Sequence, residues 1–311
     1  MKKRILSLML MAALTLGTLS GCGSAAPAET SIPEESAVAA TDAAPAEEAA
    51  SPAETAAAEE AASEEATAAG EVLARIKETG KLVVGTASGY PPYEFVDITS
   101  ADQKVIGIDM ALAEAIAETL GVELVIEDMT FSALLASLPA KKIDLAIAGI
   151  APTDERKETM DFSDSYLFAE QSFLILKSRA EELASAEAFN GQPLAAQKAT
   201  TQERVCQDLY PDSQLVALDK VPDCIMELKS GKVAGVCIES IVGQQYVLSD
   251  EELTFSAADL GIKKETAIAL EKGNEDLLEI INKVIADKMA DGSFDTWIHD
   301  YSAVAAENAG N

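Results

Sequence analysis

The sequence has little of what most acid–base and metal-dependent enzymes use. Histidine occurs once in 311 residues, at His299 near the end of the chain, and cysteine occurs four times. Only one histidine is therefore present that could serve in a Ser-His-Asp triad or as a general base, and no Cys/His cluster has metal-ligand spacing. We expect no cofactor, no metal and no enzymatic activity, although a mechanism that uses carboxylates alone stays open.

Basic residues are also scarce. The chain contains 23 Lys and Arg against 53 Asp and Glu, which gives a formal net charge of −30 at pH 7. The electrostatic attraction that supplies most non-specific binding to nucleic acid would be replaced by repulsion. We expect no nucleic-acid partner, and the acidity itself identifies no ligand.

A long apolar run occurs only at the start of the chain. Residues 1–22 begin with "MKKR", continue with roughly fifteen apolar residues and end in "LSGC". This layout is typical of a secretory signal, and a membrane span would need about 20 apolar residues and a stop-transfer flank. The last four residues resemble the bacterial lipobox, so we predict that Cys22 is lipidated and holds the exported protein at the cell membrane.

Bulky apolar side chains and basic residues are missing from the next segment. Residues 23–70 contain 20 Ala and 11 Asp or Glu, with four prolines and no Lys or Arg. Such a segment buries too little apolar surface to offset the entropy of ordering. We predict a disordered Ala/Glu-rich tether, with its ends on the order of 40 Å apart as a random coil.

The remaining residues alternate short apolar runs with amphipathic ones. Strands separated by helices imply parallel βαβ units, and Gly121 is placed to end the helix that opens at Asp109. The predicted strands are 81–86, 122–126, 143–148, 194–196, 215–217, 233–238 and 267–270, and the predicted helices are 71–79, one from 109 to 120, 131–138, 200–209, 219–229, 240–247, 275–290 and 293–301.

Two apolar runs lie between the halves of this pattern. Residues 173–177 have no helix of their own, and 267–270 are interpreted as their return partner. We read the pair as two crossings between lobes, which would form a hinge around a cleft. The predicted lobe 1 covers 71–174 plus 266–305, and the predicted lobe 2 covers 175–265.

Three cysteines follow Cys22, an odd number for an exported protein. Cys237 lies in an apolar strand and is interpreted as a small buried hydrophobic residue. A bridge between Cys206 and Cys224 stays open, because the sequence does not establish the geometry of a disulfide.

The loop "AGIAPTDER" follows the predicted strand 143–148. In α/β sheets, ligands bind beyond the carboxyl ends of the strands. Gly149 allows close approach of the backbone, a helix start near Thr153 offers unpaired N–H groups, and the planar fork of Arg156 suits a carboxylate. The alternative is that Arg156 pairs with Asp154 or Glu155 on a solvated helix face.

Four further residues follow strand ends. Thr200 stands three residues before Glu203, which is the spacing of a capping box, and so a second helix start could face Arg156. Glu239 could receive an ammonium group, with a helix cap or a surface charge as the alternative. Tyr90 and Phe131 could pack on a ligand side chain, although each alone fits a core position as well. Together these groups match the shape and charges of an amino acid.

At this point the sequence resembles a known family. "KLVVGTASGYPPYEF", "IDLAIAGIAPTDERKETMDFSDSYLF", "AAQKATTQE" and "GKVAGVCIES" are similar, in order and spacing, to the substrate-binding proteins of polar amino acid ABC transporters, family 3 of the bacterial solute-binding proteins. The resemblance covers about residues 71–303. It implies a type II periplasmic-binding-protein fold, an α/β fold with two lobes, each a mostly parallel sheet flanked by helices, that close on a ligand.

The resemblance also implies which residues hold the ligand. It assigns the α-carboxylate to Arg156, the backbone at Ala151, Thr200 and Thr201, and it assigns the α-ammonium to Glu239 with the carbonyl of Ala148 or the backbone around Gly149. It places Tyr90 and Phe131 on the ligand side chain, and Gln197 within reach of its distal group.

Three positions depart from the family pattern. Several members carry an acidic residue where this chain has Ala87, so a pocket for a basic side chain loses one support. Members often carry Ser or Thr at Ala151, which removes one hydroxyl, and glycine commonly occupies the position of Ala199.

The implied partners are a free polar amino acid, an ABC permease and its ATPase, with the protein acting as an extracytoplasmic monomer. Arginine, lysine, histidine, glutamine and cystine all stay open as the ligand. The alternatives are a sensory or scavenging module that binds without transport and an exported dehydratase on the same fold.

Overall fold

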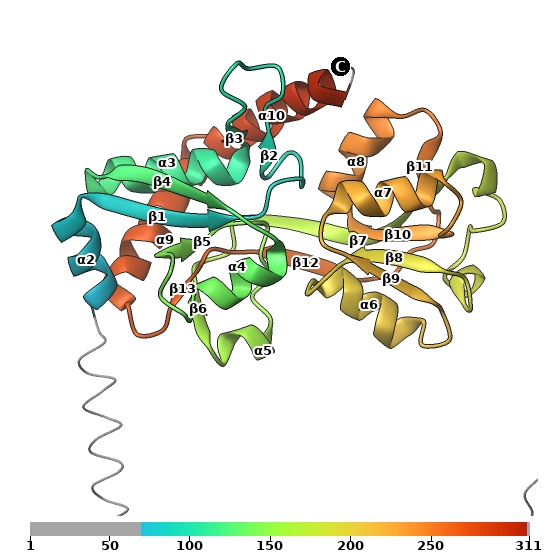
Figure 1. Ribbon diagram of the computed structural model, residues 1–311, viewed down its shortest axis with the longest axis horizontal. Coiled ribbons are helices and arrows are strands. Elements are labelled where there is room, and N and C mark those ends of the chain that lie inside the picture. Colours follow the sequence, from blue (N-terminus) through green and yellow to red (C-terminus); the bar gives the residue numbers. More distant parts are fainter. Residues whose placement is uncertain (1–69, 310–311) are drawn as a thin grey trace, which may run out of the picture. The chain divides into compact units, whose positions relative to one another are not determined.

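The computed structural model describes residues 70–309, which form a mixed α/β structure with two main sheets flanked by helices (Figure 1). The predicted signal segment 1–22 with Cys22 and nearly all of the predicted tether at 23–70 lie outside the described residues. We call the first sheet with its helices lobe 1, and the second sheet with its helices lobe 2.

The sheet of lobe 1 has the strand order β4-β1-β5-β13-β6. Strand β1 (Lys81–Thr86) is parallel to β4 (Glu123–Asp128) and β5 (Leu145–Ala146). Strand β13 (Ala269–Glu271) is antiparallel to β5 and to β6 (Met160–Phe162). Four of the five strands therefore run in the same direction, as predicted, and β13 alone runs against them because it enters the sheet from the chain that returns from lobe 2.

Helices cover both faces of this sheet. Successive side chains of a strand point to opposite faces, so Leu82 and Val84 belong to one buried cluster and Val83 packs on another. Among the helices of lobe 1, the first cluster includes residues of four and the second includes residues of one. The helices of lobe 1 are α2 (Glu71–Thr79), α3 (Ile108–Leu120), α4 (Phe131–Ser137), α5 (Asp154–Lys157), α9 (Glu275–Ala290) and α10 (Ser293–Ala309), and a small hairpin joins β2 (Phe95–Val96) to β3 (Val105–Ile106).

The sheet of lobe 2 has the strand order β11-β7-β10-β8-β9. Strand β8 (Leu194–Gln197) is parallel to β9 (Leu215–Leu218) and β10 (Gly235–Glu239), and β7 (Leu167–Leu176) is antiparallel to β10 and to β11 (Leu253–Phe255). Figure 1 shows α6 on one side of the sheet and α7 and α8 on the other. These helices are α6 (Thr201–Leu209), α7 (Val221–Lys229) and α8 (Ser240–Ser249), and two short 3-10 turns cover Lys177–Arg179 and Ala186–Phe189.

Two strands join the lobes. The first residues of β7 pair with β12 (Lys263–Thr266), while Phe173–Leu176 pair within lobe 2 (Figure 1). The predicted pairing of 173–177 with 267–270 is wrong in its residues, because the antiparallel pair forms several residues earlier on both strands. The sequence pattern missed β12 because all four of its residues are polar, so it lacks the apolar run that identified the other strands.

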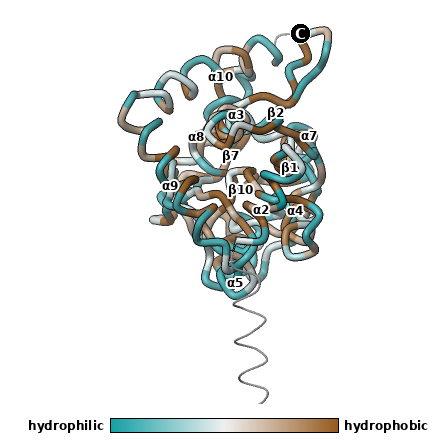
Figure 2. The backbone as a smooth tube through the Cα atoms, turned by 90° about the vertical axis from the view of Figure 1, so that its left-hand side faces the viewer, coloured by the Kyte–Doolittle hydropathy of each residue, from teal (hydrophilic) through white to brown (hydrophobic). Residues whose placement is uncertain are grey.

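Both lobes have close-packed cores. Fully buried side chains include Leu82, Ile116, Leu145 and Phe173, and each contributes roughly 1.5 to 3 kcal/mol through burial of apolar surface. The helix α5, by contrast, consists of charged residues, and Figure 2 draws it mainly in the colour of hydrophilic residues. Among residues 70–309, no helix has the length and apolar character needed to cross a membrane.

The described cysteines are three buried free thiols. Cys206 and Cys237 belong to the cluster on one face of the second sheet, and Cys224 belongs to the cluster on the other face. The Cys206–Cys224 bridge is therefore not formed, because the sheet lies between the two side chains. The predicted burial of Cys237 is confirmed. A hydrogen bond with Cys206 and burial both raise the pKa of its thiol.

Gly107 permits the close packing that positions the loop before β2. Its φ of 136° lies in a region that L side chains rarely adopt, and a Cβ atom there would lie 2.0 Å from the carbonyl oxygen of Tyr93. Next to it, the N–H groups of Ile108 and Asp109 donate to the carbonyls of Pro92 and Tyr93, at 3.0 Å each. This contact fixes the loop that carries Tyr90 against the start of α3.

We expect Gly107→Ala to lower the free energy of unfolding by at least ~2 kcal/mol, because a strained φ and a backbone clash act together. Gly80→Ala is the matched control, since Gly80 also has a positive φ of 68° but nothing within 4 Å of an added Cβ. It should cost about 1 kcal/mol. Urea unfolding of the full chain measures both, and equal costs would contradict the close approach.

Candidate functional site

Arg156 lies between the lobes. Thr153 caps the short helix α5, with its Oγ1 accepting from the N–H of Arg156 at 3.3 Å. The guanidinium donates to the carbonyl of Ala151 in lobe 1 and to the carbonyl of Ala199 in lobe 2, both at 2.8 Å. It also lies 5.4 Å from the ring centroid of Phe131. Burial lowers the pKa of Arg156 to about 10, so it keeps its charge at neutral pH.

The alternative interpretation of Arg156 does not hold in this structure. Its guanidinium pairs with neither Asp154 nor Glu155, because the carboxylate of Glu155 pairs with Arg204 of lobe 2. Arg204 and Glu155 are both exposed, so this ion pair contributes little to stability. It nevertheless adds a second contact between α5 and α6.

The start of α6 faces Arg156 from lobe 2. The predicted capping box is present: Thr200 Oγ1 accepts from the N–H of Glu203 at 3.1 Å, and the Glu203 carboxylate accepts from the N–H of Ala199 at 2.7 Å. The Thr200 hydroxyl donates its proton to the carbonyl of Gln197 at 2.6 Å. The Thr201 hydroxyl donates to Oε1 of Gln202 at 3.3 Å. The donors that this helix start can offer a ligand are therefore the first-turn N–H groups other than that of Glu203, which have no intrahelical acceptor.

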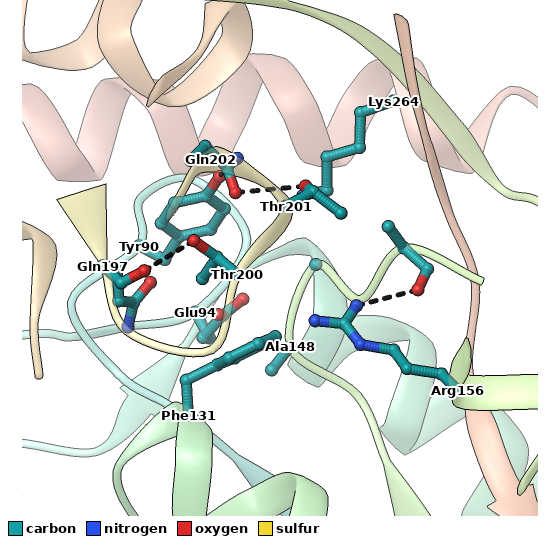
Figure 3. A pocket seen from close by; sticks show the side chains of 12 residues that line it. Tyr90, Glu94, Phe131, Ala148, Arg156, Gln197, Thr200, Thr201, Gln202 and Lys264 are labelled. Carbon is teal, nitrogen blue, oxygen red and sulfur yellow. Dashed lines mark hydrogen bonds between the residues drawn. The ribbon is translucent and has the colours of Figure 1, made fainter. Parts of the chain in front are cut away.

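Nine of the ten predicted ligand-binding residues line one cavity between the lobes (Figure 3). The cavity is nearly closed in this structure, with a volume of about 10 Å³. Their roles in ligand binding stay predictions. The nine residues are Tyr90, Phe131, Ala148, Gly149, Ala151, Arg156, Gln197, Thr200 and Thr201.

Gly149 lets an aromatic ring and a lysine approach the backbone. Its φ is 56°, and a Cβ there would lie 3.2 Å from Cε1 of Tyr90 and 3.6 Å from Nζ of Lys264. The N–H of Gly149 donates to Oδ2 of Asp109 at 2.8 Å, and the Tyr166 hydroxyl donates to Oδ1 at 2.7 Å. The Gly149 N–H is thus already used, so its contribution to a ligand would come from other backbone atoms.

Two buried carboxyl groups lie at the inner end of the cavity. Glu94 lines it, and burial together with the nearby charge of Asp109 raises the pKa of Glu94 well above its ordinary value. Burial raises the pKa of Asp109 from 3.8 to about 6, although the hydrogen bonds from Tyr166 and Gly149 oppose the shift. At neutral pH Asp109 is therefore mainly ionised, and the raised pKa of Glu94 favours its neutral form.

Glu239, the tenth predicted residue, does not line the cavity. It is fully buried at the end of β10 and forms an ion pair with Lys264, which does line the cavity. Lys264 Nζ lies 5.3 Å from the ring centroid of Tyr90 and 5.8 Å from that of Tyr93. The role of Glu239 towards an ammonium group stays a prediction, and the ammonium beside it in this structure is that of Lys264.

The sequence analysis missed three lining residues, Glu94, Gln202 and Lys264. Gln202 follows Thr201 in the first turn of α6, and its Nε2 donates to the Tyr90 hydroxyl across the cleft at 3.2 Å. Its position close to the predicted helix cap at Thr200 could have identified it from the sequence as a lining residue. Glu94 and Lys264 are charged residues in a turn and in an unrecognised strand, and only the packing shows that they are buried.

The fold and the cleft together define a two-lobed protein that encloses a small ligand. The chain belongs to the bacterial extracellular solute-binding proteins, family 3, whose model matches residues 82–303. This match covers nearly all the described residues, so both lobes and the cavity fall within it.

Three relatives illustrate the similarity. The chain is 30% identical over 219 residues to the arginine-binding extracellular protein ArtP of Bacillus subtilis, covering 69% of this chain and 83% of ArtP. It is 28% identical over 222 residues to the L-cystine-binding protein TcyJ of Escherichia coli, covering 71% and 82%. The crystal structure of the amino acid ABC transporter substrate-binding protein AbpA from Streptococcus pneumoniae, bound to L-arginine, matches with a TM-score of 0.73 and 33% identity, covering 75% of this chain and 98% of AbpA.

The raised pKa of Asp109 predicts a pH-dependent effect of Asp109→Asn. A carboxyl whose folded pKa exceeds its unfolded value stabilises the fold at low pH and loses that contribution as pH rises through the folded value. Since the amide stays neutral, the variant should gain stability relative to the wild type between about pH 4 and pH 7, by up to about 3 kcal/mol for a shift of about two units. Urea unfolding across this range measures the difference, and a constant difference would contradict the assignment.

Proposed function

We propose that this protein captures a free polar amino acid between its two lobes and delivers it to an ABC importer. Membership of the solute-binding family and the names of the relatives support a transport role. The single observation that carries the proposal is the half-buried guanidinium of Arg156, which lies at the cleft and reaches acceptors on both lobes.

The α-carboxylate would bind at Arg156. A guanidinium has five N–H donors, and two of them are used by the carbonyls of Ala151 and Ala199. The others can meet a carboxylate that also accepts from the first-turn N–H groups of α6. The N-terminus of this helix carries partial positive charge, which favours an anion.

The α-ammonium would bind near Ala148 and Glu239. Oε1 of Glu239 has no hydrogen-bond partner within residues 70–309 although it is fully buried, and a buried acceptor without a donor is costly. Phe131 and Tyr90 would pack on the ligand side chain, and Gln197 would reach its distal group.

Closure of the lobes would be the functional step. The predicted bounds are 71–174 plus 266–305 for lobe 1 and 175–265 for lobe 2, and the first crossing lies a few residues earlier, because 171–176 of β7 pair within the sheet of lobe 2. A ligand that contacts both lobes binds the closed form better than the open form and shifts the equilibrium towards it. Strands β7 and β12 are the natural hinge, because they are the antiparallel pair that joins the two sheets.

The protein would act outside the cytoplasm while attached to the cell membrane. Residues 1–22 carry the signal pattern, and Cys22 would receive the lipid. Residues 23–70 would then let a monomeric binding module reach the permease and its ATPase.

A dehydratase is the second candidate, because Glu94 is a buried carboxyl in the cavity whose pKa is raised above its ordinary value. Buried acids with perturbed pKa values are typical of catalytic sites as well as of structural networks. Incubation of the full chain with a prephenate-like acid tests this candidate, and we expect no turnover.

We expect Arg156→Ala to weaken amino acid binding by at least ~2 kcal/mol, or about 30-fold, because a buried carboxylate would lose a charged hydrogen-bond partner. A thermal-shift screen of free amino acids identifies the ligand, and isothermal titration calorimetry measures the change in Kd.

Arg204→Ala is the matched control for this experiment. Arg204 also joins the lobes, but its ion pair with Glu155 is exposed, so its loss should change the Kd by less than about fivefold. An unchanged affinity in Arg156→Ala, in a protein that binds an amino acid, would remove Arg156 from the site.

A further inference from the structure

A buried lysine reaches the cleft from the strand pair that joins the lobes. Lys264 lies on β12 with 5% of its side chain exposed, and it forms an ion pair with the fully buried Glu239. Its ammonium also faces the rings of Tyr90 and Tyr93, and such contacts favour a cation in a desolvated site. The location of Lys264 is therefore fixed by three partners.

This ion pair sets the sign of the charge that the cavity presents. Lys264 is a lining residue, whereas Glu239 is not. The positive end of the pair thus faces the cavity and the negative end is turned away from it. A ligand group in the cavity lies closer to the cation than to the carboxylate, so it experiences a positive field from the pair.

The other lining residues supply no negative charge to offset this field. The ionisable lining side chains besides Lys264 are Arg156, which is cationic, and Glu94, whose pKa is raised by burial and by the charge of Asp109, which favours its neutral form. Asp109 lies behind the lining and is compensated by two donors, the N–H of Gly149 and the hydroxyl of Tyr166. The remaining polar lining side chains are neutral: Tyr90, Gln197, Thr200, Thr201 and Gln202.

A cationic side chain would therefore meet two like charges in this cavity. At about 6 Å and an effective dielectric constant of about 20, the ammonium alone would weaken binding by roughly 100-fold, and the Glu239 carboxylate bound to it reduces this to the order of tenfold. A neutral or acidic side chain does not meet this repulsion. Ala87, buried at the end of β1, adds no carboxylate on the side of Phe131.

We propose that Lys264 determines specificity by selecting amino acids whose side chain is neutral or acidic over those whose side chain is cationic. The inference rests on the proposed amino acid binding function. The proposed preference would distinguish this chain from ArtP, which is named as an arginine-binding protein, and from AbpA, whose crystal structure contains bound L-arginine.

L-arginine and its uncharged analogue L-citrulline, which are closely similar in shape, provide the test. Titration calorimetry on the full chain gives the ratio of the two Kd values, and we expect L-citrulline to bind at least ~10-fold more tightly. Lys264→Met should shift this ratio at least ~10-fold towards L-arginine. Lys263→Met is the matched control: Lys263 is the exposed neighbour on β12, and its loss should leave the ratio unchanged.

A second variant covers the case in which Lys264→Met does not fold, since it leaves a buried unpaired carboxylate. Lys264→Gln combined with Glu239→Gln removes both charges and should still shift the ratio towards L-arginine, by at least about threefold. An unchanged ratio in the folded variant, or tighter binding of L-arginine by the wild type, overturns the inference while amino acid binding stands. If none of the free amino acids, L-citrulline included, binds to the wild type, the proposed function and this inference fail together.

Discussion

A buried guanidinium must find hydrogen-bond acceptors, and Arg156 finds them on both lobes. One acceptor is the carbonyl of Ala151 in its own loop, and the other is the carbonyl of Ala199 across the cleft. Removing a charge from water is costly unless it is paired or hydrogen-bonded. The contact between α5 and the start of α6 therefore depends on this side chain, and the cavity beside it takes its shape from the same contact.

The other charges of the cleft obey the same constraint. Lys264 is satisfied by Glu239 and by aromatic rings, and Asp109 by two donors, whereas burial raises the pKa of Glu94 and so favours its neutral form. The partners of Lys264 and Asp109 come from segments that are far apart in the sequence. The result is a cavity whose polar groups are held in place before any ligand arrives, which reduces the cost of binding.

Most elements of lobe 1 and lobe 2 could be predicted from the sequence. The helices at 71–79 and 275–290 agree with the structure, and the cap at Thr200 and the αL glycine at 121 are present. Local patterns specify these features because the interactions are between residues a few positions apart. The pattern was less informative for β12 and for the direction of β13, since strand pairing depends on partners distant in the chain.

The sequence by itself determined the fold class, the loop that carries Arg156 and the residue types that could hold an amino acid. Local hydrogen-bonding chemistry and hydrophobic periodicity act over short separations, so they can be read without coordinates. Only the tertiary structure decided that Glu239 is paired with Lys264, that Cys206 and Cys224 lie on opposite faces of a sheet, and that two cations face the cavity. Burial and charge pairing arise when distant segments meet, because the energy of a charge depends on what surrounds it.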